Sequence, residues 1–229
     1  MSDLISIIIP AYNNAHFLAR AINSVKAQTY RNWEVIIVDN NSTDNTDKVL
    51  SLFVDQRIKT YKINNDGIIA RSRNLGIERA NGKYIAFLDS DDWWAPKKLE
   101  KSMAQLLLGA DLVFHDLYMI KNDQFYSLPF RRVTSRNLKK NVFEDLIKQG
   151  NGIPNSSVVT KTEMLKKIGL LNESKDFIGW EDYDLWLRLA HENYKFIRLR
   201  GTLGYYWWGE NNMSSPHRTI KNCMSFCST

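Results

Sequence analysis

Cysteine is scarce in this chain of 229 residues, which holds only Cys223 and Cys227. Two cysteines cannot build the disulfide framework of a small secreted domain, and the chain has no pair of C-x-x-C motifs that would indicate structural zinc. The four histidines are scattered at positions 16, 115, 191 and 217, without the spacing of a zinc site. A reducing cytoplasm is therefore the expected compartment.

Long apolar runs are also missing. No stretch approaches the ~18 consecutive apolar residues that a membrane span needs. The first ten residues, MSDLISIIIP, lack a basic region and carry Asp3, so we expect no signal peptide. The expected localisation is cytoplasmic, and a peripheral position at the inner face of the cytoplasmic membrane is compatible with it.

Three nucleotide and hydrolase motifs are absent. The chain has no G-x-G-x-x-G after its first apolar run, no G-x-x-x-x-G-K-[ST] and no G-x-S-x-G. These absences disfavour a dinucleotide dehydrogenase, a P-loop enzyme and an α/β-hydrolase. The content of 44% hydrophobic and 24% charged residues is that of an ordinary globular protein, and the length favours one domain over 1–229.

What the sequence does contain is an alternation of strand-like and helix-like segments. In the first half, strands are predicted at 4–9, 33–38, 57–63 and 84–88, with helices at about 17–25, 49–53, 68–80 and 93–108. In the second half, we predict a hairpin and a basic loop within 117–140, helices at 142–148 and 181–191, and strands at 111–115, 156–160, 196–199 and 203–207. This alternation predicts an α/β fold with a mostly parallel sheet, whose ligands bind beyond the carboxyl ends of the strands.

Acidic residues follow the strand predicted at 84–88. Asp89 and Asp91, separated by Ser90, would concentrate negative charge where the buried strand stops. Carboxylate oxygens suit Mg²⁺ or Mn²⁺, and such a metal could bridge to the phosphates of a substrate. The alternative is a helix-capping cluster in which Asp92 caps the helix predicted at 93–108.

Two further acidic positions allow a structural and a functional interpretation. Asp39 ends the strand predicted at 33–38, where it could form a turn or accept hydrogen bonds from a base or ribose. Glu181 and Asp182 open a predicted helix, where the helix dipole favours acids, and one of them could act as a general base.

The net charge of +6 arises entirely after residue 95, because the first 95 residues carry equal numbers of acidic and basic side chains. Five basic residues fall within ten positions: Arg131, Arg132, Arg136, Lys139 and Lys140. We predict that they hold the protein near an anionic membrane surface or a diphosphate-linked lipid, the alternative being a solvated loop. Tryptophans are not interleaved with this cluster, so a nucleic-acid partner is not expected.

Four ordered blocks resemble family 2 of the inverting GT-A glycosyltransferases. They are SIIIPAYNN, VIIVDNNSTDNT, GIIARSRNLGIERANGKYIAFLDSDDWW and GWEDYDLWLRLA. The resemblance covers roughly residues 4–108 and 176–214. It implies a GT-A fold, which is a Rossmann-like, mostly parallel sheet flanked by helices with a smaller acceptor-side subregion. Residues 1–108 would then bind the nucleotide sugar, and residues 109–229 the acceptor.

The resemblance also implies roles for the matching residues in the nucleotide half. Pro10, Ala11 and Tyr12 would line the pocket for the nucleotide base, and Asp39 would contact the base. In the metal motif Asp89-Ser90-Asp91, Asp91 would bind Mn²⁺ or Mg²⁺ directly and Asp89 would lie nearer the ribose.

Four other residues match the family at the phosphate and acceptor sides. Arg73 and Asn74 match a block beside the phosphates. Asp182 matches the base that deprotonates the acceptor hydroxyl, and Glu181 would orient the acceptor or that base. Near the end of the chain, the family's Y-R-x-H pattern is replaced by Tyr-Trp-Trp-Gly at 206–209, which leaves no histidine there.

The function that follows is an inverting, metal-dependent hexosyltransferase. Its donor would be a UDP-hexose or UDP-N-acetylhexosamine, and its acceptor a lipid-diphosphate-linked saccharide in surface polysaccharide assembly, such as O-antigen or capsule. Two alternatives stay open at this point, a nucleotidyltransferase that makes an activated sugar and a non-catalytic nucleotide-sugar or carbohydrate-binding module. The segment Pro10-Ala11-Tyr12 argues against the first, since it is not a Gly- and Lys-rich loop, and the retained acidic pairs argue against the second.

Overall fold

Nine strands form one mixed sheet in the computed structural model, which describes residues 2–121, 132–133 and 135–209. In these residues the strands are β1 (Ile5–Ala11), β2 (Trp33–Asp39), β3 (Ile58–Lys62), β4 (Tyr84–Phe87), β5 (Trp93–Trp94), β6 (Leu112–Ile120), β7 (Arg132–Val133), β8 (Val159–Lys161) and β9 (Phe196–Trp207). Their order is β3-β2-β1-β4-β8-β6-β9-β5, with β7 paired to β6. The first four strands are mutually parallel, and β8 is antiparallel to both of its neighbours.

Helices connect most of these strands. They are α1 (Ala15–Lys26), α2 (Thr46–Leu50), α3 (Ile69–Glu78), α4 (Lys98–Leu107), α5 (Val142–Gln149), α6 (Thr162–Lys167) and α7 (Glu181–His191), with short 3-10 turns at Asn155–Ser157 and Lys175–Phe177. The helix predicted at 142–148 and the one predicted at 181–191 are confirmed, whereas α6 was not expected from the sequence.

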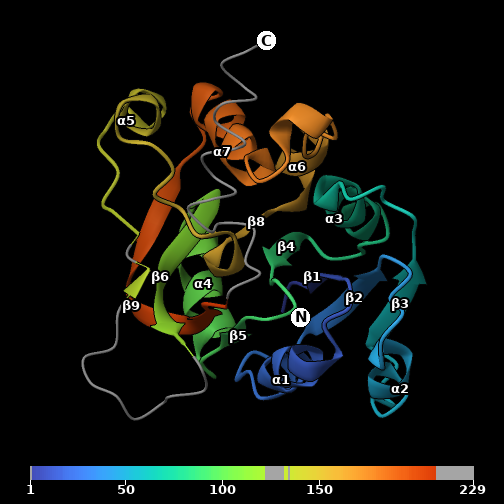
Figure 1. Ribbon diagram of the computed structural model, residues 1–229. Helices are drawn as coiled ribbons and strands as arrows, with labels where there is room; N and C mark the ends of the chain where they lie inside the picture. Colours follow the sequence, from blue (N-terminus) through green and yellow to red (C-terminus); the bar gives the residue numbers. More distant parts are fainter. Residues whose placement is uncertain (1, 122–131, 134, 210–229) are drawn as a thin grey trace.

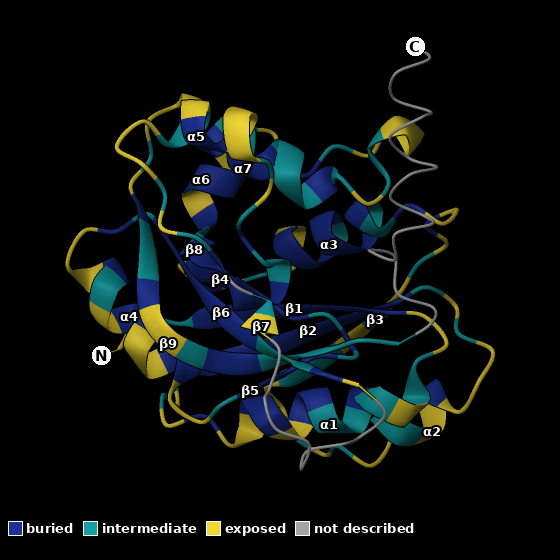
Figure 2. Ribbon diagram, turned by 60° about the vertical axis from the view of Figure 1, so that its left-hand side comes forward, coloured by how far each residue is buried: buried dark blue, intermediate teal, exposed yellow. Residues whose placement is uncertain are grey.

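The helices cover both faces of the sheet, so the molecule has three layers (Figure 1). Helices α1, α2 and α4 pack on one face and α3, α5, α6 and α7 on the other. The central strands β1, β2 and β4 are buried throughout (Figure 2). Burial on both faces explains why β1 and β2 are continuous apolar runs rather than alternating ones. The predicted α/β architecture is confirmed.

A close approach of α3 to β1 fixes the helix that carries Arg73. Gly76 lies so near Ile8 that an added Cβ would come within 2.5 Å of the Ile8 Cγ2 atom. Because glycine has no side chain, the backbone of α3 can sit directly on the sheet.

The structure corrects the helix predicted at 93–108. Trp93 and Trp94 form β5 instead, pairing with Tyr205 and Gly204 of β9, and the helix begins only at Lys98. Consequently Asp92 caps no helix. Its Oδ1 atom accepts the backbone N–H of Trp207 at 2.9 Å.

The ends of the sheet differ from the prediction in a second way. The strands expected at 196–199 and 203–207 are one strand, β9, which follows β6 along its length with two irregularities in register. The expected hairpin within 117–140 is confirmed, because β7 pairs antiparallel with β6. Within the residues that the structure describes, no helix is long and apolar enough to cross a membrane.

The side chain of Lys98 is fully buried. Its Nζ atom has no hydrogen-bond partner among the described residues and lies 3.8 Å from the centre of the Trp94 ring. Burial lowers the pKa of the Lys98 amine well below its ordinary value, and it lowers the pKa of nearby His115 to about 3. Burial therefore favours the neutral form of the amine in the folded protein.

Replacing Lys98 with methionine should stabilise the protein. At pH 7, Lys98→Met removes a desolvated amine, and we expect the free energy of unfolding to rise by about 1–3 kcal/mol in urea denaturation. The unfolded lysine binds a proton below pH ~10.4 and the folded one does not, so wild-type stability falls as the pH decreases below that value. The advantage of the variant should therefore shrink as the pH rises toward 10. A variant less stable than wild type at pH 7 would show that the folded amine is charged and stabilised by Trp94.

Candidate active site

The carboxyl ends of three parallel strands meet at one edge of the sheet. Ala11 at the end of β1 lies beside Asp39 at the end of β2, and Ile8 of β1 lies beside Phe87 of β4. The loops that follow these strands therefore start from the same edge. This register brings together the predicted base-pocket residues, Asp39 and the acidic loop, defined here as residues 89–92.

The predicted base pocket contains one exposed aromatic side chain. Tyr12 is 60% exposed, while Pro10 and Ala11 are buried. The Asp39 carboxylate is fully buried and accepts hydrogen bonds from the backbone N–H and the hydroxyl of Ser42. Asp39 therefore forms the turn that the sequence allowed, and its contact with a base stays a prediction.

Helix α1 and the residue before it hold the acidic loop in place. Asn14 precedes α1, and its side chain makes no capping bond but donates to the Ser90 hydroxyl at 2.8 Å. Arg20 donates to the backbone oxygen of Asp91 at 3.1 Å, and its guanidinium lies 3.6 Å above the ring of Trp93. The loop is thus fixed through its backbone and Ser90.

The acidic loop carries excess negative charge. Burial, and then the neighbouring Asp89, raise the pKa of Asp91 to about 6. The same causes, with Asp91 added, raise the pKa of Asp92 well above its ordinary range. A divalent cation with oxygen ligands would relieve this repulsion, so Asp89 and Asp91 fit one that takes its remaining ligands from substrate phosphates. Among the described residues, no cluster of three or more Asp, Glu, His or Cys side chains could hold a metal alone.

Arg73 of α3 joins the acidic loop to the start of α7. One of its terminal nitrogens lies 2.8 Å from Asp89 Oδ1, and the other lies 2.6 Å from Glu181 Oε1. The second oxygen of Glu181 accepts the N–H of Gly179 at 2.7 Å. Asn155 also donates to Asp89 Oδ1, at 3.2 Å. Both carboxylates are therefore held in fixed orientations, although they come from elements far apart in the sequence.

Asp182 follows Glu181 in the chain, and its carboxyl group has a raised pKa. Burial, and then the charge of Glu181, raise the pKa of Asp182 to about 7, while Arg73 acts in the opposite direction. Its Oδ1 atom accepts the N–H of Tyr183 at 2.7 Å, and its Oδ2 atom lies 3.5 Å from Asn151 Nδ2. A carboxylate with a pKa near neutrality can accept a proton from a substrate, which is what a general base must do.

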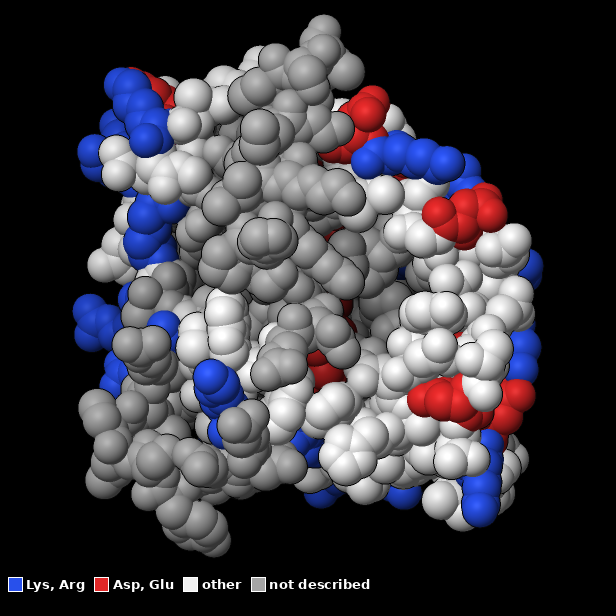
Figure 3. All heavy atoms as spheres, viewed as in Figure 1, with Lys and Arg blue, Asp and Glu red and all other residues white. Residues whose placement is uncertain are grey.

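The surface shows where charge gathers around these residues. In Figure 3, acidic atoms are visible within the recess at the middle of the face, and both acidic and basic side chains lie toward its borders.

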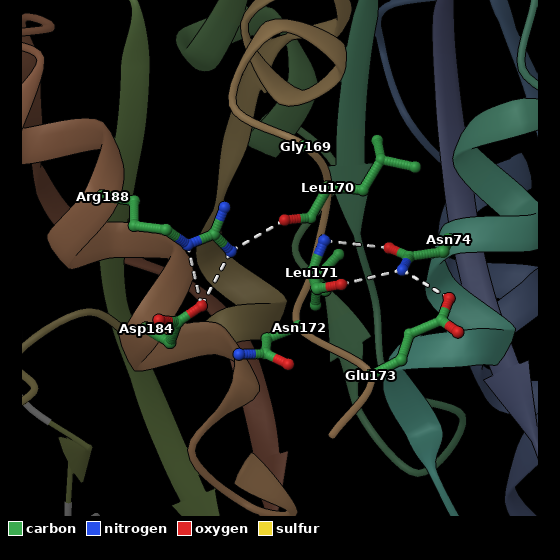
Figure 4. Close-up of a pocket in the computed structure, with 8 residues that line it drawn as sticks. All are labelled: Asn74, Gly169, Leu170, Leu171, Asn172, Glu173, Asp184 and Arg188. Carbon is green, nitrogen blue, oxygen red and sulfur yellow. Dashed lines mark hydrogen bonds and ion pairs between the residues drawn. The ribbon is translucent and has the colours of Figure 1, made fainter.

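Asn74 of α3 is bound to the loop 169–173, and its predicted position beside the phosphates stays a prediction. Its amide exchanges two hydrogen bonds with the backbone of Leu171, at 2.9 and 3.0 Å, and donates a third to Glu173 at 2.8 Å (Figure 4). The pocket of about 520 Å³ that Asn74 lines includes none of the strand-end acids. Asn74 thus holds the loop 169–173 that leads toward α7.

One of the five basic residues between positions 131 and 140, Arg136, is bound within the protein. Arg136 donates to the backbone oxygens of Gly150 and Asp145, both at 2.9 Å, and forms an ion pair with the Asp145 carboxylate at 3.1 Å. Arg136 is thus half-buried and bound within the protein, and its contact with a membrane stays a prediction. Arg132, Lys139 and Lys140 are exposed, and Arg131 lies outside the described residues. Membrane contact by the three exposed residues stays a prediction.

Sequence reasoning missed several residues that shape the site. Asn14 and Arg20 position the acidic loop, and Asn151 and Asn155 contact Asp182 and Asp89. The one available signal was the segment 150–155, whose glycine, asparagine and proline content is typical of a turn.

Removing the Arg73 guanidinium should destabilise the protein strongly. Arg73→Met leaves Glu181 and Asp89 without their cation, and we expect a loss of about 3–5 kcal/mol in urea denaturation at pH 7. Arg71→Met is the matched control, because Arg71 lies on the same helix and pairs with Asp66 and Glu173 at the surface. Equal losses in the two variants would contradict a special role for the bridge.

Comparison with known proteins identifies relatives of this chain. The family model "Glycosyl transferase family 2" matches residues 6–165. The chain is 35% identical over 193 residues to the UDP-Glc:alpha-D-GlcNAc-diphosphoundecaprenol beta-1,3-glucosyltransferase WfgD of Escherichia coli, covering 83% of this chain and 71% of WfgD. It is 32% identical over 200 residues to WfaP of E. coli, which carries the same description, covering 87% of this chain and 74% of WfaP.

A solved structure has the same fold. S. aureus TarS 1-349 in complex with UDP-GlcNAc superposes with a TM-score of 0.71 at 22% identity, covering 92% of this chain and 60% of TarS. The chain thus spans less than two thirds of that protein, and the likeness supports the GT-A fold expected from the sequence. The predicted division at residue 108 stays a prediction. From its matching family model and these relatives, the chain belongs to glycosyl transferase family 2.

Proposed function

We propose that this glycosyltransferase moves a sugar from a UDP-sugar to a hydroxyl of a lipid-diphosphate-linked saccharide, with inversion at the anomeric carbon. The observation that carries the proposal is the Arg73 bridge, which places two acidic groups of different character side by side. On one side are Asp89 and Asp91 of the acidic loop, and on the other is Asp182 with a pKa of about 7.

The relatives support the choice of substrates. WfgD and WfaP are named for transfer from UDP-Glc to alpha-D-GlcNAc-diphosphoundecaprenol. We therefore place this chain in surface polysaccharide assembly, with a UDP-hexose or UDP-N-acetylhexosamine as its donor. Tyr12 offers its exposed ring to the base of the donor, at the edge where Asp39 also lies.

In the proposed reaction, Asp182 takes the proton of the acceptor hydroxyl. The hydroxyl oxygen bonds to the anomeric carbon from the face opposite the diphosphate, the bond from that carbon to the diphosphate oxygen breaks, and UDP leaves with the electron pair. No covalent enzyme intermediate forms, so the configuration inverts. When bound by Asp91 and Asp89, Mn²⁺ or Mg²⁺ would supply positive charge to stabilise the departing diphosphate.

Asp182→Asn tests the base. Because asparagine cannot accept the proton, we expect sugar transfer to fall by about 10²–10⁴-fold while the protein stays folded. In the wild type, kcat/KM should rise with pH and level off above about 7, since only ionised Asp182 is active. The assay is mass spectrometry of a lipid-diphosphate saccharide after incubation with UDP-Glc or UDP-GlcNAc. Transfer by Asp182→Asn at the wild-type rate would refute the assignment.

Metal removal tests the acidic loop. We expect a chelator to abolish transfer and Mn²⁺ or Mg²⁺ to restore it, because Asp91 and Asp89 would need a cation to bind the diphosphate. Asp91→Asn should weaken binding of UDP in the presence of metal, as measured by calorimetry. Without metal, the substitution should reduce the charge repulsion among the carboxylates of the acidic loop. Wild-type activity that survives complete chelation would contradict metal dependence.

A further inference from the structure

One short segment, residues 150–156, contacts acids on both sides of the proposed reaction. Asn151 Nδ2 lies 3.5 Å from Asp182 Oδ2, and Asn155 Nδ2 lies 3.2 Å from Asp89 Oδ1. The two asparagines are only four positions apart, so a movement of this segment would displace groups beside both acids.

The side chain of Arg136 holds the start of this segment. This side chain donates to the backbone oxygen of Gly150 at 2.9 Å and is itself paired with Asp145. Gly152 packs against the same guanidinium so closely that an added Cβ would lie 2.3 Å from Arg136 Nη1. The absence of a side chain at Gly152 therefore allows the segment to lie against Arg136.

The side chain of Asn151 has a fixed orientation although it is exposed. Its Oδ1 atom accepts the backbone N–H of Ile153 at 3.0 Å, which turns its Nδ2 atom toward Asp182. The other oxygen of Asp182 is already occupied by the N–H of Tyr183. The Oδ2 atom, which faces Asn151 at the longer distance of 3.5 Å, is the less tightly bound of the two oxygens and is the one that we assign to accept a proton.

We propose that Asn151 is a positioning residue, whose amide orients the Oδ2 atom of Asp182 toward the acceptor hydroxyl. Catalytic hydrogen bonds are often long without substrate and shorten in the complex, so 3.5 Å is a suitable starting distance. The inference rests on the proposed function, because it assigns Asn151 a role beside the base of that reaction. Arg136 and Gly152 support Asn151 by holding the backbone on either side of it.

Several charged groups act on the pKa of Asp182. Glu181 precedes it on α7, Arg73 reaches it from α3, and Asp89 lies at the end of β4. None of these groups is altered by a substitution of Asn151, so a shift in the pH profile would report on the contact of position 151 with Asp182.

Two substitutions of Asn151 test the proposal. Asn151→Ala should lower kcat by about 10-fold or more, because misplacing a reacting group by about 1 Å can cost ~10²-fold. Asn151→Asp places a second carboxylate beside Asp182 and should move the acidic limb of kcat/KM to higher pH. The dissociation constant for UDP, measured by calorimetry, should match that of wild type in both variants.

Two more variants complete the design. Gln149→Ala is the matched control, because Gln149 is an exposed amide on the same stretch of chain, and it should behave as wild type. Gly152→Ala should lower kcat in the same direction as Asn151→Ala, since its methyl group forces Arg136 and the segment apart.

The outcomes separate the inference from the proposed function. If wild type transfers sugar and Asp182→Asn does not, but both Asn151 variants and Gly152→Ala match Gln149→Ala in kcat and in pH profile, the inference alone is overturned. If wild type transfers no sugar across the donors and acceptors, both are overturned. A fall in kcat with a shifted acidic limb and unchanged UDP binding supports the inference.

Discussion

The two ion pairs of Arg73 are the interaction on which the site depends. A guanidinium presents its terminal nitrogens in a rigid plane, so it can hold one carboxylate at each and fix the angle between them. Here one carboxylate, Asp89, follows β4 and the other, Glu181, begins α7. Helix α3 can bring Arg73 between them only because Gly76 lets the helix sit directly on β1. The acidic loop and the start of α7 are thus joined through a single side chain of α3.

Local charge then gives neighbouring acids different properties. Glu181 is paired with Arg73 and bonded to a backbone N–H, which suits a fixed anion. Asp182, one residue later, lacks the direct ion pair and has a pKa of about 7. Because the two carboxylates repel each other, neutralising one by Arg73 leaves the other to carry the exchangeable proton. Burial, together with position relative to one cation, therefore gives the two acids of this pair different properties.

The sequence predicted those parts of the fold and site that depend on local patterns of apolar and polar residues. Buried strands read as apolar runs, and parallel strands bring their carboxyl ends to one edge, so the placement of Asp39 and Asp89 followed from the pattern. The prediction failed at Trp93, because pairing with β9 more than 100 residues away decides that segment. The partners of Asn74 and Arg136 could not be predicted either, because they lie in loops whose course no local pattern specifies.

The contact of Asn74 with its loop bears on how freely this chain can vary. Asn74 binds the N–H and C=O groups of Leu171, which every residue except proline possesses. The side chains at positions 170 to 172 can therefore change without loss of these two bonds, whereas position 74 cannot. These two bonds constrain position 74, whereas the loop is constrained separately, by the packing of buried Leu171 in the core. A surface next to α7 can in this way acquire new side chains while the helix that starts with Glu181 keeps its place.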